Sequence, residues 1–350
     1  MARVDVTVRG GGIFGLSIAW ACLTRGAKVR LVETLAIGAG SSGGLVGALA
    51  PHVPENWNDK KAFQLDSLLM AGDWWAAVQA AGGVDPGYLR SGRLQPLTDA
   101  RAVDLARARS ASAALLWRGQ ATWSVVAATG DPWEPHSPTG LLVQDTLTAR
   151  LSPRRAGAAL LAAIRARGGE VVLGEAEDEG QVVWATGHAG LLELSARLGR
   201  PVGGGIKGQS LALRLDHPGL EARPQLFIDA LHVVPHVDGT VAIGSTSETD
   251  WDDPHGTDAR CDALQARARA ALPLLDKATV VERWAGIRPR ARSKAPMLGP
   301  WPDRPGHFIA NGGFKIGFGM APKVAEVMAD LLLGGDDGGI PPGFRVEANL

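Results

Sequence analysis

The sequence of 350 residues predicts an α/β fold in which two domains are interleaved along the chain, and three observations lead to this prediction. The N-terminal segment has the pattern of a strand, a glycine-rich turn, a helix and a second strand. A segment near the C-terminus repeats the order of strand, glycine-rich turn and helix. Between them, residues 205–290 contain several short strand patterns and one helix, which indicates an antiparallel sheet.

The elements follow in order. Alternating residues predict a strand over residues 4–8, helical periodicity covers residues 13–25, and KVRLVE predicts a strand over residues 28–33. Further helices are predicted over residues 59–82, 101–115, 153–168, about 257–272 and about 318–333. The remaining strands are predicted at GEVVL, QVVWATG, KGQSLAL, LHVVPHV, TVAIGST, VVERWAGI and HFIAN.

Composition and charge describe an ordinary globular chain and argue against two classes of partner. The 36 basic and 36 acidic side chains cancel, so no broad electrostatic attraction to nucleic acid or to an anionic membrane is expected. No apolar run reaches the length of a membrane span, and no signal-peptide pattern is present, so a cytoplasmic location is expected. Cys22 and Cys261 give neither a disulfide framework nor a zinc spacing, and no metal is expected.

The N-terminal turn carries a dinucleotide fingerprint. Gly10, Gly12 and Gly15 form G-x-G-x-x-G directly after a strand and directly before a helix. In such a turn the glycines allow a tight bend, close approach of a pyrophosphate and close packing of the helix on the strand. Glu33, 18 residues after Gly15 at the end of the next strand, stands where an acid accepts hydrogen bonds from ribose hydroxyls. The sequence therefore predicts a Rossmann-type domain.

Two further segments favour FAD over NAD as the dinucleotide. Residues 41–44 (SSGG) and 46–51 (VGALAP) are small and can line an extended FAD. Residues 308–321 (FIANGGFKIGFGMA) place a helix start where its positive end can stabilise a reduced flavin. The predicted FAD-binding domain comprises residues 1–50, 145–204 and 291–340, and the predicted α+β substrate domain, with its antiparallel sheet, comprises residues 51–144 and 205–290.

Over residues 4–334 the sequence resembles the D-amino-acid oxidase and glycine oxidase family of FAD-dependent oxidoreductases. The resemblance is carried by GGGIFGLSIAWACLTRGAKVRLVE, SSGGLVGALAPHVPE, LHVVPHVDGTVAIGSTSE, ERWAGIRPRARSKAPMLGP and NGGFKIGFGMAP, in this order. Together with the fingerprint glycines, it implies FAD contacts at Ile13, Phe14, Glu33, Thr34, Ser41, Ser42, Val46, Gly47, Ala48, Gly313, Phe314, Lys315, Ile316, Gly317, Phe318 and Gly319.

Three residues are candidates for the chemistry. Arg288, in AGIRPR, matches the arginine with which the family holds the substrate carboxylate, and a guanidinium can fork two donors onto that group. Lys315 stands where glycine oxidases carry a second arginine, and His232 where they carry an active-site tyrosine. His232 can equally be a histidine of the hydrophobic core with no role in the site. Because these residues depart from the family pattern, the substrate stays open.

The resemblance implies an oxidase for a small amine or amino acid, of the glycine, sarcosine or D-amino acid type. Hydride passes from the carbon next to nitrogen to the flavin, and dioxygen reoxidises the flavin and forms hydrogen peroxide. A dehydrogenase that passes electrons to a quinone or protein acceptor is the alternative. A flavoprotein acting through a partner and a tRNA-modifying oxidase are less consistent with Arg288 and the neutral charge. The oligomeric state, a homo-oligomer included, and the roles of Arg9, His52 and Glu55 stay open.

Overall fold

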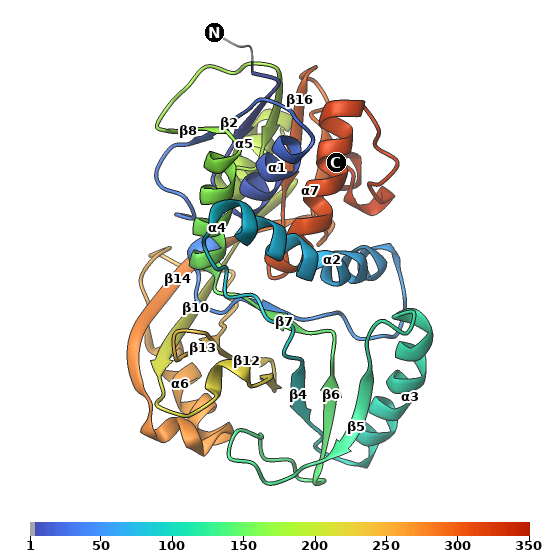
Figure 1. Cartoon of the computed structure of the whole chain (residues 1–350), viewed down its shortest axis with the longest axis vertical. Helices are drawn as coiled ribbons and strands as arrows, with labels where there is room; N and C mark the ends of the chain where they lie inside the picture. The colour runs from blue at the N-terminus through green and yellow to red at the C-terminus, as the bar shows by residue number, and fades with distance from the viewer. Residues whose placement is uncertain (1–3) are drawn as a thin grey trace.

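Two β-sheets organise the chain, which the computed structural model describes over residues 4–350 (Figure 1). The first sheet has the order β15 (Met297–Pro300), β16 (His307–Asn311), β9 (Gln181–Trp184), β1 (Val6–Arg9), β2 (Val29–Glu33), β8 (Glu170–Leu173). Only β15 and β16 are antiparallel neighbours, and the other pairs are parallel. Runs of valine suit these strands because a parallel sheet is covered on both faces.

Helices cover this sheet and form its core. α1 (Ile13–Thr24) buries every residue from Ile13 to Leu23, as expected for a helix that is apolar on all sides. It packs against α7 (Gly317–Gly334) and α4 (Pro153–Ala166), and both α4 and α7 also contact α2 (Asp59–Gly82). α5 (Gly187–Leu198) follows β9 and packs against β16.

The second sheet has eight strands and is assembled from two distant parts of the chain. Its order is β14 (Thr279–Ala291), β10 (Gly203–Arg214), β13 (Thr240–Gly244), β12 (Leu231–Pro235), β11 (Gln225–Ile228), β4 (Arg93–Pro96), β6 (Leu141–Asp145), β5 (Trp123–Ala127). All neighbours are antiparallel except β11 and β4. α6 (Ala259–Ala271) packs on β10, β13 and β12, and α3 (Ala100–Leu116) packs on β5.

The predicted fold class is confirmed: a parallel Rossmann-like sheet is combined with a mostly antiparallel second sheet. Figure 1 shows the first sheet with α1, α5 and α7 in the upper half, the second sheet below, and α2 between them. The short ladder of β3 (Ala48–Leu49) with β7 (Ala149–Arg150) lies where the two parts of the molecule meet. The chain thus passes repeatedly between the two sheets. Among residues 4–350, no helix is long and apolar enough to cross a membrane.

Five short 3-10 helices complete the structure. They are η1 (Ser41–Gly43), η2 (Leu220–Ala222), η3 (Pro273–Lys277), η4 (Pro342–Phe344) and η5 (Val346–Asn349). η1 matters most for function, because it lies next to the start of α1 and contacts α4 and β14. α2 has clear local ends: the Asn58 side chain accepts a hydrogen bond from the Lys61 N–H, and Gly83 follows the helix with φ 70°.

Candidate active site

The turn between β1 and α1 needs glycine at two positions for steric reasons. Gly10 has φ +109°, and a Cβ there would lie 2.4 Å from the carbonyl oxygen of Ala185. A Cβ on Gly15 would lie 1.9 Å from the carbonyl oxygen of Gly10. At Gly12 the one close atom is Ser42 Oγ, at 3.2 Å, so this position is open on its other sides. The first and third glycines therefore pack the turn, while the second leaves its backbone accessible.

Two side chains complete this turn. Ser42 Oγ accepts a hydrogen bond from the Ile13 N–H at 2.9 Å, which leaves the hydroxyl hydrogen free to donate to an anion. The carboxylate of Glu33 accepts from the N–H groups of Gly11, at 2.7 Å, and Leu35, at 2.9 Å. Each of its oxygens keeps a second acceptor position, which suits the hydroxyls of a ribose. The N-cap residue Gly12 has no side chain, so apart from the bond between Ile13 and Ser42 no side-chain hydrogen bond caps the start of α1 in the described residues.

The second glycine-rich turn, before α7, lies against the first. A Cβ on Gly313 would lie 2.8 Å from Cζ of Phe14, and a Cβ on Gly317 would lie 3.6 Å from Cγ2 of Ile13. No side chain caps the start of α7 either. Two helix N-termini with unsatisfied N–H groups thus adjoin one another, an arrangement that suits an anionic ligand.

The VGALA segment connects the two sheets beside these turns. Gly47 has φ +64°, and a Cβ there would lie 1.8 Å from the carbonyl oxygen of Leu151. A Cβ on Gly244, at the end of β13, would lie 2.5 Å from Cγ2 of Val46. His236 Nε2 donates to the carbonyl oxygen of Leu45 at 3.1 Å. This segment is therefore fixed between the start of α4 and β12–β13.

Arg288 lies on β14 and has no carboxylate partner among residues 4–350. Its single hydrogen bond runs from Nη1 to the carbonyl oxygen of Thr246, at 3.1 Å. Gly208 on the neighbouring β10 makes room for the guanidinium, since a Cβ there would lie only 1.9 Å from Nη2. Burial lowers the pKa of Arg288 to about 10, against the opposing effect of the Glu248 charge, so the side chain stays cationic at neutral pH.

The charge of Lys315 interacts with Arg288 on one side and with His232 on the other. The turn that carries Lys315 is tied to β14 through the Phe314 N–H, which donates to the carbonyl oxygen of Pro289 at 2.9 Å. Burial and the charge of Arg288 lower the pKa of Lys315. Burial lowers the pKa of His232 to about 3, and the charges of Arg93 and Lys315 act in the same direction. His232 is therefore neutral at pH 7.

His232 has a definite environment. Its ring lies 4.7 Å from the ring of Phe227, centroid to centroid, and its buried Nδ1 has no hydrogen-bond partner within residues 4–350. Arg93 stands behind this pair, 5.5 Å from the Phe227 centroid, and is itself paired with the buried Asp145 at 2.9 Å. A buried nitrogen without a partner suits a ligand-facing residue better than a residue of the core.

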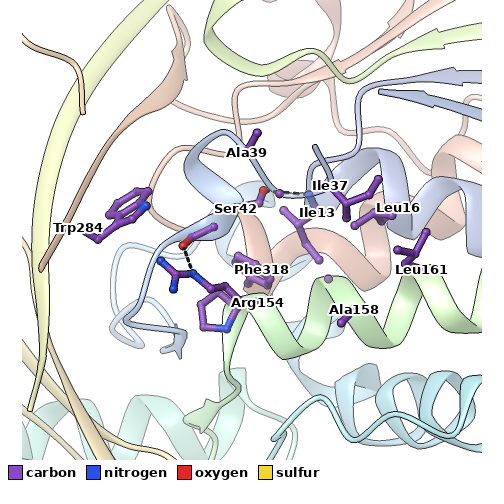
Figure 2. A pocket seen from close by; sticks show the side chains of 14 residues that line it. Ile13, Leu16, Ile37, Ala39, Ser42, Arg154, Ala158, Leu161, Trp284 and Phe318 are labelled. Carbon is purple, nitrogen blue, oxygen red and sulfur yellow. Dashed lines mark hydrogen bonds between the residues drawn. The ribbon is translucent and has the colours of Figure 1, made fainter. Parts of the chain in front are cut away.

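A cavity of about 440 Å³ adjoins the start of α1 (Figure 2). Ile13, Ser42 and Phe318, which are among the predicted cofactor contacts, form part of its wall, together with side chains of α4 and Trp284. Arg154 borders it and donates from Nε to the carbonyl oxygen of Gly43 at 2.8 Å. Arg288, Lys315 and His232 are not in its wall, so this cavity belongs to the α1 turn.

The three residues whose roles the sequence left open have structural contacts. Arg9 pairs with Asp178 at 2.6 Å and lies over the Trp184 ring, 5.3 Å from its centroid. Glu55 forms a two-pronged ion pair with Arg109 on α3, at 2.7 and 2.9 Å, which lowers the pKa of Glu55. The Nδ1 atom of His52 lies 2.5 Å from Gln64 Oε1 on α2. These contacts fix loops, and none of them reaches Arg288.

The comparisons with known proteins identify the family of the chain. Residues 5–331 match the DAO family, described as FAD dependent oxidoreductase. The chain belongs to this family. It is an FAD-dependent oxidoreductase, as the resemblance implied. FAD fits the residues described above, since two uncapped helix starts, the open backbone at Gly12 and the free donor of Ser42 all suit its phosphates.

Individual relatives in this family cover most of the chain. A protein of Rhizobium etli named ThiO is 30% identical over 340 residues, 94% of this chain and 96% of that protein. The glycine oxidase of Geobacillus kaustophilus is 26% identical over 362 residues, 94% of this chain and 93% of that protein. The chain spans about half the length of the bifunctional ThiO/ThiG protein of Nostoc sp., with 26% identity over 352 residues and 52% of that protein covered.

Solved structures share the whole fold. The crystal structure of glycine oxidase from Geobacillus kaustophilus superimposes with a TM-score of 0.83 at 23% identity and covers 99% of both chains. The structure of iminodiacetate oxidase from Chelativorans sp. BNC1 gives 0.83 at 21% identity, with 94% of this chain and 95% of that chain covered. At this identity the likeness establishes the fold alone.

Sequence reasoning missed three residues of this region. Gly208 inside the KGQSLAL strand is a signal that could have been used, because an interior strand glycine often marks the close approach of another group. The Arg93–Asp145 pair behind His232 gave no such signal, since its two strands are adjacent only in the folded sheet. No group of three or more metal-ligating side chains is found in the described residues.

Proposed function

We propose that this chain is an oxidase for a small amino acid or amine of the glycine type and that dioxygen is its acceptor. The observation that carries the proposal is Arg288, a partly buried guanidinium without a carboxylate partner in the described chain, beside the glycine-rich turn of α7. A substrate carboxylate supplies the missing counter-charge, and the two donors of the guanidinium fix its orientation. The relative named glycine oxidase supports the same class of substrate.

The cofactor supplies the redox step. Bound FAD would supply the redox chemistry: the hydride from the carbon next to nitrogen would go to the flavin, and the two electrons would pass on to dioxygen, which would take up two protons to give hydrogen peroxide. The substrate nitrogen loses a proton as the imine forms, and water then hydrolyses the imine to an oxo acid and ammonia or an amine. No strong base is required of the protein at the carbon.

The chain's own residues are proposed to bind the cofactor, to orient the substrate and to form hydrogen bonds with it. Gly12, Ser42 and Glu33 are proposed to hold the pyrophosphate and ribose, on the basis of the donors and acceptors that they leave free. Arg288 positions the substrate carboxylate, so that the neighbouring C–H bond is held in one place. The neutral imidazole of His232 can donate or accept one hydrogen bond through Nδ1, the atom that the protein leaves without a partner.

A flavin-bleaching screen tests the proposal. The purified holoprotein is mixed anaerobically with glycine, sarcosine, D-alanine or D-proline, and the visible absorbance of the oxidised flavin is followed. We expect at least one of these compounds to bleach the flavin, and we expect the colour to return in air with one hydrogen peroxide formed per oxidised substrate. A protein that binds FAD but is bleached by no amine or amino acid contradicts the proposal. Reoxidation by a quinone and not by air contradicts the choice of dioxygen.

A further inference from the structure

The site around Arg288 holds more positive charge than one carboxylate can balance. Arg288 and Lys315 have no ion pair with any described carboxylate, and the same holds for Arg290. Lys315 Nζ and Arg290 Cζ lie 5.7 and 5.9 Å from the centroid of the Phe314 ring. The Arg290–Gly313 bridge and the Phe314–Pro289 hydrogen bond hold these residues together.

Glu248, whose charge acts on Arg288, and Asp145, which lies beside Arg93, are already used elsewhere. Glu248 accepts hydrogen bonds from Gln209 and Thr246, and it pairs with Arg260 at 3.0 Å. Asp145 pairs with Arg93 and accepts two hydrogen bonds from Thr148. Neither side chain can turn to Arg288 or Lys315 without leaving a buried partner unsatisfied. The positive charge in front of β14 is therefore not balanced from within the described chain.

Like charges that share a partly desolvated place raise each other's energy, and a bound anion relieves this. The lowered pKa of Lys315, caused by burial and by Arg288, reflects this situation. A glycine-type substrate brings one carboxylate, which Arg288 engages, and Lys315 then keeps its charge without a partner. His232 adds no charge of either sign at neutral pH.

We infer that the substrate carries two carboxylates on either side of its amine, one held by Arg288 and the other by Lys315. This inference rests on the proposed function and specifies its substrate class as an amino dicarboxylic acid. Lys315 suits the second carboxylate because it is a single point charge on a flexible stem, which tolerates substrates of different length. Arg288 fixes the first carboxylate, next to the carbon that is oxidised.

A binding experiment separates this role of Lys315 from a role toward FAD. Diglycolate carries two carboxylates around an ether oxygen that replaces the amine, and methoxyacetate is its counterpart with one carboxylate. Neither has an amine to be oxidised, so each Kd is read from the change in the flavin spectrum of the holoprotein. We expect diglycolate to bind about tenfold or more tightly than methoxyacetate, because it gains one charge-assisted contact.

Variants of Lys315 then assign the second contact. Lys315→Met is expected to weaken diglycolate about tenfold and to leave the methoxyacetate Kd unchanged, whereas Lys315→Arg keeps the preference for diglycolate. Arg292→Met is the matched control, since it removes an exposed cation just beyond the end of β14. Equal Kd values for the two ligands in the parent overturn the inference. So does a Lys315→Met variant that weakens both ligands alike, because Lys315 then acts on the flavin or on the first carboxylate.

The substrate screen keeps the two proposals distinguishable. With iminodiacetate and its monoamide as substrates, we expect kcat/KM to favour the diacid in the parent, and Lys315→Met to remove that preference. If glycine and sarcosine bleach the flavin as fast as iminodiacetate does, the dicarboxylate inference fails while the proposed oxidase function stands. If no amine bleaches the flavin, the proposed function itself fails.

Discussion

Gly208→Ala tests whether Arg288 acts in the position that the structure shows. The glycine lies on β10, beside β14, and the three atoms nearest to a Cβ at this position belong to the Arg288 guanidinium. A Cβ at this position would lie 1.9 Å from Nη2, 2.1 Å from Cζ and 2.2 Å from Nη1. Because these atoms form the end of a flexible side chain, the guanidinium moves and the backbone does not. The fold and the FAD site should therefore survive.

The size of the effect follows from the displacement. A carbon in van der Waals contact needs about 3.5 Å, so the guanidinium must retreat by roughly 1.5 Å. Misplacement of a positioning group by about 1 Å can cost about 100-fold in rate. We therefore expect kcat/KM for a carboxylate substrate to fall about 100-fold, which corresponds to about 2.8 kcal/mol.

Steady-state kinetics on the holoprotein measure this change, with FAD content and Tm recorded for the same preparation. Gly204→Ala is the matched control, because Gly204 lies on the same strand and a Cβ there meets no atom within 4 Å. We expect the control to keep the parental kcat/KM and both variants to keep their FAD. If Gly208→Ala is folded, holds FAD and has the kinetics of the control, Arg288 does not bind substrate from this position.

Three further predictions follow. Gly15→Ala should abolish FAD binding, since its Cβ would lie 1.9 Å from a backbone carbonyl oxygen. Gly72→Ala, on α2, is the control and should keep FAD, because a Cβ there would meet no described atom within 4 Å; flavin absorbance measures both. Burial lowers the pKa of His236 from 6.5 to about 4, so between pH 7 and pH 4 the unfolded chain binds more protons than the folded chain. The free energy of unfolding should therefore fall as the pH drops through this range. Urea titrations measure this fall, which should be smaller in His236→Gln than in the parent. Arg93→Met should reduce the free energy of unfolding by about 3–5 kcal/mol in urea titrations, because it leaves the buried carboxylate of Asp145 unpaired, and an unchanged value would refute the role of the pair.

Local signals explain which elements could be predicted from the sequence. The strand, turn and helix around residues 6–24 carry their own start and stop residues, and the predicted and observed bounds agree within about two residues. α2 was predicted at its observed bounds for the same reason. α5 was missed although Leu191 and Leu194 are buried at helical spacing, because it follows β9 after only a short turn.

Long-range pairing explains most of what was missed. β4 has four residues and ends with Pro96, and it becomes a strand because β6 lies on one side of it and β11 on the other. Nothing within four residues can encode partners that are tens of positions away in the sequence. The antiparallel character of the second sheet was nevertheless predictable, because β10 to β14 supply several recognisable strands.

The residue types of the site were readable from the sequence, but their charge balance was not. The motif AGIRPR identifies Arg288, yet only the structure shows that no described carboxylate pairs with it and that Gly208 makes room for it. For His232 the sequence left a core position and a site position equally open. The buried Nδ1 without a partner and the pKa of about 3 now favour a neutral residue that faces a ligand.

A net charge of zero is compatible with the proposed anion-binding site, because cations without an ion-pair partner are gathered there. Two uncapped helix N-termini meet near Ile13 and Gly317, and the unpaired cations Arg288 and Lys315 lie beside the second of them. Most other arginines are neutralised in ion pairs, such as Arg93 with its buried carboxylate. Positive charge is therefore unbalanced where an anionic dinucleotide and an anionic substrate are proposed to bind. Neutralising the site cations should thus affect ligand binding far more than it affects folding.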